Sequence, residues 1–74
     1  MTYNMKYFNE NAKRIETHYD EVYELDGHTI AVTECSRCAR RQYYNVCVDG
    51  LTIATRALAS NAIRFALNHL NKQQ

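Results

Sequence analysis

The sequence contains no proline and only two glycines among its 74 residues. This composition excludes a collagen-like repeat and a Pro/Gly-rich low-complexity linker. No apolar run approaches the roughly 18 residues of a membrane-spanning helix, and the stretch from Met1 to Lys6 lacks the apolar core of a secretory signal. We therefore expect one small domain over residues 1–74, with no membrane partner.

The three cysteines are an odd number, which favours free thiols in a reducing, cytoplasmic compartment. Cys35 and Cys38 have the C-x-x-C spacing of a zinc knuckle or a redox motif, but tetrahedral zinc needs two further ligands. If 28–35 pairs with 42–48, Cys47 lies opposite about residue 30, too far from Cys35 for one metal shell. We expect ordinary thiols, no metal and no cofactor, with zinc and redox chemistry as alternatives.

An amphipathic helix is predicted near the start of the chain. Apolar residues at spacings of three and four, the pattern of one helical face, are Met5, Phe8, Ala12, Ile15 and Tyr19. Thr2 or Asn4 provides an N-cap. The prediction is a helix over about 4–17.

Two Asp-Gly pairs, Asp26-Gly27 and Asp49-Gly50, each separate two extended runs. Asp-Gly favours the type I′ turn of a β-hairpin. Strands are therefore expected over about 20–25, 28–35, 42–48 and 51–56, with a polar turn over 36–42. Alternation places Ile30 and Val32 on one face of the strand over 28–35. It likewise places Tyr44, Val46 and Val48 on one face of the strand over 42–48.

A second helix is predicted in the last segment, where apolar residues recur at helical spacing from Leu58 to Leu70 and Ser60 is a plausible N-cap. The expected fold is α+β, a single α-β-β-β(-β)-α domain with an antiparallel meander sheet and both helices on one face. The opposite, open face is expected to carry Tyr43, Asn45, Thr29, Thr33, Thr52 and Ala54.

The net charge of +1 conceals a marked asymmetry. Residues 1–34 have a net charge of −4, and residues 35–74 have a net charge of +5. One interpretation is that the two halves neutralise each other in the folded chain. The other is that each forms a patch of a single sign. The acidic patch would consist of Glu16, Asp20, Glu21, Glu24 and Asp26, and it would imitate nucleic-acid phosphate against a basic groove.

The basic residues cluster in the predicted turn at 36–42. Arg37, Arg40 and Arg41 are followed by Tyr43, and guanidinium groups beside aromatic rings suit either nucleic acid or a protein surface. Phe65 falls on the polar side of the last helix, which suggests a partner contact. The alternatives are a solvated hairpin tip for the arginines, and cover by the first helix for Phe65.

The final stretch "VDGLTIATRALASNAIRFALNHL" is similar in shape to the last strand and helix of the double-stranded-RNA-binding domain. The resemblance implies an α-β-β-β-α layout and RNA binding. That family grips phosphate with a Lys-Lys-x-x-Lys cluster at the start of the final helix. The matching region here, Arg56 to Asn61, contains one cation.

No Ser-His-Asp or Cys-His set and no glycine-rich phosphate loop can be placed, so we do not expect an enzyme. The leading hypothesis is a small binding protein that inhibits or modulates a larger protein or nucleoprotein complex. In general character it resembles phage or mobile-element accessory proteins, such as anti-CRISPR and host-takeover inhibitors. The expected partner-binding residues are Arg37, Arg40, Arg41, Tyr43 and Phe65. The alternative is a nucleic-acid-binding module, and either is compatible with a homo-oligomer that buries Phe65 or an edge strand.

Overall fold

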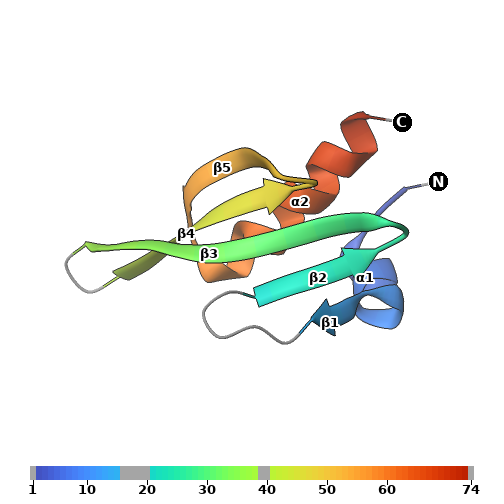
Figure 1. Cartoon of the computed structure of the whole chain (residues 1–74), viewed down its shortest axis with the longest axis horizontal. Coiled ribbons are helices and arrows are strands. Elements are labelled where there is room, and N and C mark those ends of the chain that lie inside the picture. Colours follow the sequence, from blue (N-terminus) through green and yellow to red (C-terminus); the bar gives the residue numbers. More distant parts are fainter. Residues whose placement is uncertain (1, 16–20, 39–40, 74) are drawn as a thin grey trace.

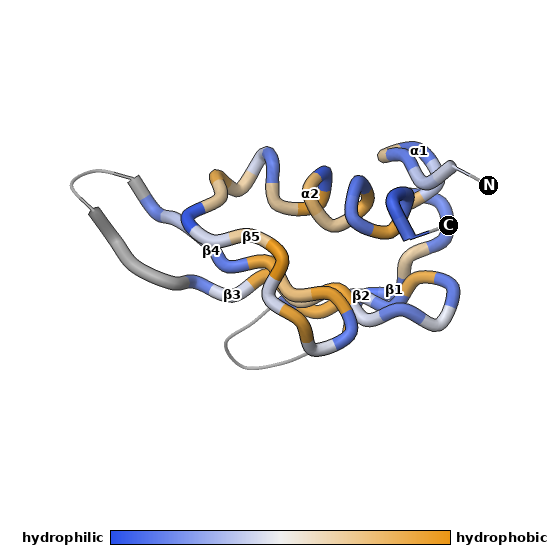
Figure 2. The backbone as a smooth tube through the Cα atoms, turned by 90° about the horizontal axis from the view of Figure 1, so that it is seen from above, coloured by the Kyte–Doolittle hydropathy of each residue, from blue (hydrophilic) through white to orange (hydrophobic). Residues whose placement is uncertain are grey.

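The computed structural model describes the backbone of residues 2–15, 21–38 and 41–73, and the side chains of these residues except 35–38 and 41. Figure 1 shows the order of the elements along the chain. They are α1 (Met5–Asn11), β1 (Lys13–Ile15), β2 (Glu21–Leu25), β3 (His28–Cys38), β4 (Arg41–Val48), β5 (Leu51–Ala57) and α2 (Ala59–Lys72). The strands form one antiparallel meander in the order β1-β2-β3-β4-β5, and both helices cover one face of it (Figure 2). The predicted α+β fold class is confirmed.

Helix α1 is shorter than the sequence pattern predicted. Asn4 caps it, because its side-chain oxygen accepts a hydrogen bond from the Tyr7 backbone N–H at 2.8 Å. The helix ends at Asn11, and Ala12 already has extended backbone angles. Lys13 to Ile15 then form β1 against β2. The predicted helix over 4–17 was therefore wrong at residues 12–15, because pairing with the sheet overrides the helical spacing of Ile15, and residues 16–17 lie outside the described part of the chain.

Both Asp-Gly pairs form the predicted tight turns. Asp26 and Gly27 have φ angles of 51° and 82°, and Asp49 and Gly50 have 52° and 85°. Two successive positive φ angles are the signature of the type I′ turn, which matches the twist of the flanking strands. Because the sheet is a meander, both turns lie at the same end of it.

The core lies between the helices and the sheet. Ile30 and Val32 on β3, and Val46 and Val48 on β4, are buried as predicted. The remaining buried side chains are Phe8, Leu25, Ala57, Ala62, Ala66, Leu67 and Leu70. Small alanines on α2 let the helix lie close to the sheet. The cap of α2 differs from the prediction: Leu58, not Ser60, is the N-cap residue, and it makes no side-chain capping bond.

Strand β5 is irregular at two places. Its register against β4 shifts between Val46 and Cys47, and again between Tyr44 and Val46. Arg56 has a φ of 55°, in the left-handed region. The first shift brings Ala54 opposite Val46, on the side of the core, so the prediction that Ala54 lies on the open face was wrong. Bulges of this kind disrupt the ladder of an edge strand and discourage edge-to-edge association.

The face away from the helices carries a row of residues that crosses all five strands. The register places Ile15, Val22, Ala31, Cys47 and Thr52 side by side. Rows of polar residues flank it, with Lys13, Glu24 and Thr29 on one side and Thr33 and Asn45 on the other. No helix in the described part of the chain is long and apolar enough to cross a membrane.

Candidate functional site

The pairing of β3 with β4 continues beyond the rest of the sheet. β5 ends opposite Tyr44, whereas β3 and β4 still pair at Cys38 and Arg41. We call this two-stranded ribbon, residues 36–38 and 41–43, the arm. β3 has 11 residues, which span about 36 Å at about 3.3 Å per residue. β3 thus runs along most of the long dimension of the 39 × 25 × 22 Å molecule, and the arm at its end extends away from the helices (Figure 1).

The arm corrects the prediction of a polar turn over 36–42. Within the described backbone, Arg37 lies opposite Gln42, Arg41 lies opposite Cys38, and the register shifts between Glu34 and Ser36. Polar side chains do not prevent a ladder, because it is the backbone groups that pair. The polarity of this segment is therefore compatible with a pair of strands as well as with a turn.

The five predicted contact residues fall on two elements. Arg37, Arg41 and Tyr43 are on the arm, where Tyr43 is half-buried opposite Ser36. Arg40 lies outside the described residues. Phe65 is on α2, where 42% of its surface is exposed. Arg37 and Arg41 are therefore on different elements from Phe65.

Only part of the predicted acidic patch can be located, since Glu16 and Asp20 lie outside the described residues. Glu21 and Glu24 are exposed on β2, and their cross-strand partners are Val32 and Thr29. Val32 faces the core and Thr29 faces the open side, so the two glutamates lie on opposite faces of the sheet. Glu24 also lies opposite Lys13 of β1. The role of this acidic stretch in binding stays a prediction.

The third described carboxylate of that stretch, Asp26, is held by two tyrosines. The Tyr7 hydroxyl donates to Asp26 at 2.8 Å and 3.0 Å, and the Tyr3 hydroxyl donates at 3.2 Å. The pKa of Tyr7 is raised, chiefly by this hydrogen bond. The pKa of Tyr3 is raised first by burial and then by Asp26. The first hairpin turn is thereby tied to the segment that contains α1.

The second turn is tied to β3. Nδ1 of His28 lies 2.7 Å from Oδ2 of Asp49, and the Thr29 backbone N–H donates to Oδ1 at 2.9 Å. A carboxylate only accepts, so Nδ1 carries the hydrogen. The hydrogen bond from His28, followed by that from Thr29, lowers the pKa of Asp49. Sequence reasoning missed these contacts, although a meander with two Asp-Gly turns requires both turns to share one end.

Among the residues whose side chains are described, no three His, Cys, Asp or Glu groups are arranged to hold a metal ion. Cys47 is a free thiol opposite Ala31, close to its predicted place in the ladder. Its Sγ lies 3.3 Å from Oγ1 of Thr52. The side chains of Cys35 and Cys38 are outside the described set.

Comparison of the chain with protein-family models, with curated proteins and with solved structures gives no match. Its class therefore follows from the structure: a small α+β domain with a five-stranded meander and a projecting two-stranded arm. The double-stranded-RNA-binding layout that the sequence resembles has three strands, whereas this sheet has five.

Proposed function

We propose that this chain is a non-enzymatic binding protein that uses its arm to occupy a surface of a larger protein or nucleoprotein complex. The supporting observation is that the arm extends past β5, so that only β3 and β4 pair along it. A two-stranded ribbon is at best marginally stable by itself in water. A ribbon that projects past the rest of its sheet is well suited to insertion into, or addition onto, a partner.

The chemistry of the arm favours an acidic partner surface. Arg37 and Arg41 occupy positions on its two strands, and Tyr43 follows on β4. Guanidinium groups bind carboxylates through paired hydrogen bonds, and Arg and Tyr are enriched in the energetically dominant part of interfaces. Binding would act by steric and electrostatic blockage. The inhibitors of phage and mobile elements, which the chain resembles in size and charge, act on host complexes in the cytoplasm, and the free thiol of Cys47 is compatible with that compartment.

A second candidate function is nucleic-acid binding. The major groove of DNA accepts a two-stranded β-ribbon, and arginine binds phosphate. The two candidates differ in their response to salt. Affinity for nucleic acid falls steeply with salt in proportion to the phosphates neutralised, whereas a protein interface responds mainly through its association rate.

The first experiment is fluorescence anisotropy with random double-stranded and single-stranded DNA and RNA, at low and physiological salt. We expect no binding at physiological salt. Micromolar binding to nucleic acid that is lost as the salt concentration rises would favour the nucleic-acid-binding function over the protein-binding function. Affinity capture with the immobilised chain then identifies a protein partner, and calorimetry measures its affinity.

The decisive variant is the double substitution Arg37→Ala with Arg41→Ala, which should abolish partner binding without changing the circular dichroism spectrum. The matched control is Lys6→Ala with Lys72→Ala, which removes two exposed cations from the helices. Partner binding that survives the arm substitutions would exclude the arm as the contact. Phe65→Ser should mainly weaken association with the partner, and it should have a smaller effect on the stability of the monomer.

A further inference from the structure

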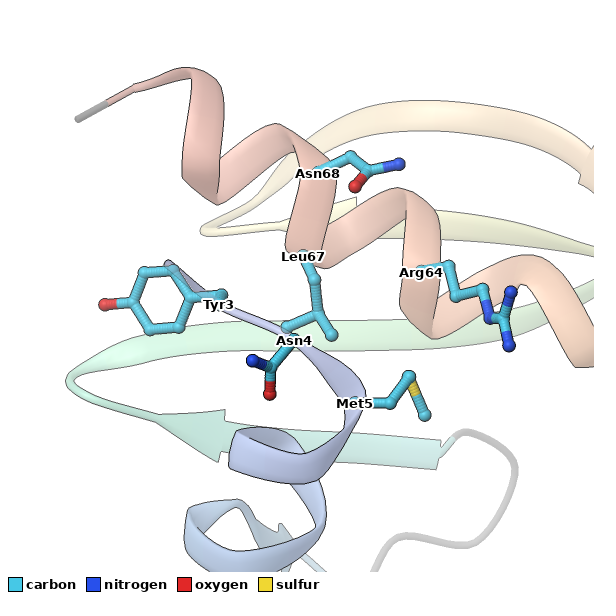
Figure 3. A pocket seen from close by; sticks show the side chains of 6 residues that line it. All are labelled: Tyr3, Asn4, Met5, Arg64, Leu67 and Asn68. Carbon is cyan, nitrogen blue, oxygen red and sulfur yellow. The ribbon is translucent and has the colours of Figure 1, made fainter. Parts of the chain in front are cut away.

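A groove separates the N-terminal segment from α2. Its volume is about 330 Å³, near the lower limit for ligand sites. The residues that line it are Tyr3, Asn4, Met5, Arg64, Leu67 and Asn68. In Figure 3, Leu67 points from α2 toward the N-terminal segment, and Arg64 and Met5 lie at the same end. The groove is thus formed by residues from opposite ends of the sequence.

The walls of this groove are held in place by hydrogen bonds. The Asn71 side chain accepts from the Tyr3 backbone N–H at 2.7 Å and donates to the Tyr3 carbonyl at 2.9 Å. Asn4 is held by its cap to Tyr7. Because the N-terminal segment is already ordered against α2, an occupant would not have to order it on binding, which favours affinity.

The lining combines an apolar floor with a cationic rim. Leu67 is only 3% exposed and Met5 is half-buried, whereas Arg64 and Asn68 are exposed. Arg64 and Asn68 are four residues apart, so they are neighbours on the surface of α2. None of the hydrogen bonds or ion pairs of the described residues involves the side chain of Arg64 or Asn68. These donors are placed to meet an acceptor from outside.

The charge on the α2 side of the groove is positive, whereas the carboxylate of Asp26 lies against the hydroxyl of Tyr3 on the other side. Among the described residues that line the groove, Arg64 alone is charged, and α2 contains Arg64 and Lys72 but no Asp or Glu. A carboxylate approaching Arg64 therefore meets no acidic side chain from the helix. One cation and a pocket of this volume suit one carboxylate beside one apolar side chain. Binding of a nucleic-acid backbone, by contrast, uses several cations in series.

We propose that this groove binds a short acidic peptide segment of the partner protein. An apolar side chain of that segment packs on Leu67 and Met5, and a neighbouring carboxylate pairs with Arg64 while Asn68 donates a hydrogen bond. This inference rests on the proposed function, since it assigns a second contact to the same binding protein. It places the contact on the helical layer, apart from the arm.

The test is a titration of the ¹⁵N-labelled chain with the peptide acetyl-Glu-Asp-Leu-Phe-Asp-Glu-amide, followed by amide chemical shifts. We expect saturable shifts confined to residues 3–5 and 64–68. A peptide with serines in place of Leu and Phe, and one with lysines in place of the acidic residues, should both fail to shift these amides. Equal shifts with either control peptide would overturn the proposal.

Substitutions in α2 provide the matched comparison. Arg64→Glu should raise the Kd of the peptide about tenfold or more, because a charged hydrogen bond is replaced by repulsion. Lys72→Glu makes the same charge change on the same helix outside the groove, and it should raise the Kd by no more than about threefold, as expected for a screened, distant charge. Equal effects of the two substitutions would mean a diffuse attraction and no site. Unchanged melting temperatures of both variants exclude a folding defect, and Arg64→Gln, which removes only the charge, serves if Arg64→Glu does not fold.

The outcomes separate this proposal from the previous one. Absence of shifts at millimolar peptide overturns the groove site, while sensitivity of partner binding to the arm substitutions still supports the proposed function. If the peptide shifts the groove amides while the arm substitutions leave partner binding unchanged, the groove site is supported. The arm is then excluded as the contact. Shifts at residues 3–5 and 64–68 with oligothymidylate, but not with the peptide, would replace the peptide by nucleic acid as the occupant.

Discussion

The side-chain amide of Asn71 and the backbone of Tyr3 exchange two hydrogen bonds, at 2.7 Å and 2.9 Å, across a separation of 68 residues. The amide matches both a backbone donor and a backbone acceptor, so it acts as a short piece of β-ladder. Asn71 is half-buried on α2. The pair joins the last helix to the segment that leads into α1, and it holds Tyr3, which lines the groove, against α2.

Asn71→Ala should lower the free energy of unfolding by about 1–3 kcal/mol, because it leaves two partly buried backbone groups of Tyr3 without partners. Urea denaturation followed by circular dichroism measures this change. Asn61→Ala is the control, since Asn61 is exposed on the same helix, and we expect a change within about 0.5 kcal/mol. Equal effects of the two substitutions would contradict the structural role of Asn71.

The hydrogen bonds of Asp49 predict that the free energy of unfolding decreases in acid. The hydrogen bond from His28, and then that from Thr29, lower the pKa of Asp49 in the folded state. A carboxyl group with a lowered folded pKa stabilises the fold above its unfolded pKa of about 3.9 and loses this contribution as the pH falls through the folded value. The difference in unfolding free energy between wild type and Asp49→Asn should therefore be largest above about pH 4 and shrink below it.

The measurement is urea denaturation at a series of pH values from neutral to acidic. Asparagine is the appropriate replacement because it tolerates the left-handed backbone conformation of position 49. His28→Ala removes the largest cause of the lowered pKa. In that background the substitution Asp49→Asn should have a smaller effect at neutral pH, and a double-mutant cycle gives the coupling directly. Additive effects would contradict the contact.

The backbone conformation of Arg56 predicts that its replacement by glycine stabilises the domain. Its φ of 55° is in the left-handed region, which costs a non-glycine residue about 1–2 kcal/mol. Glycine removes that cost but adds about 0.5–1 kcal/mol of unfolded-state entropy. Arg56→Gly should therefore stabilise the domain by up to about 1.5 kcal/mol, as measured by thermal unfolding.

The adjacent Thr55→Gly substitution is the matched control. Thr55 is exposed on the same strand, and it is not among the described residues with positive φ. We expect it to destabilise the domain by about 0.5–1 kcal/mol. The two glycine substitutions should thus have opposite signs. A loss of stability with Arg56→Gly would show that the arginine side chain contributes more than its backbone conformation costs.

The strands were predictable because local chemistry and tertiary structure agree there. Asp-Gly pairs set two turns, and the alternation around Ile30 and Val46 identified the buried face. The helix predicted over 4–17 failed for the opposite reason. Ile15 fits the helical spacing, but its pairing with Val22 across the sheet is a long-range contact with no local signal.

Of the two candidate binding surfaces, the sequence indicates one and not the other. The cluster that contains Arg37 and Arg41 is visible in the sequence, yet its polarity suggested a turn rather than a projecting ribbon. The groove has no counterpart in the sequence, because Met5 and Arg64 are distant along the chain and meet only in the fold. Contacts of this kind depend on how α1 and α2 pack, which spacing alone does not specify.

The contact between Tyr3 and Asn71 brings the two ends of the chain together, far from the arm (Figure 1). Residues near the beginning and the end of the sequence are therefore close together in space. A short linker would join the ends without crossing the sheet, and new ends could then be opened at the Asp49-Gly50 turn. Such a circular permutant would keep the arm and the groove intact, and the same geometry allows a fused reporter to be attached before residue 2 or after residue 73 without obstructing the arm.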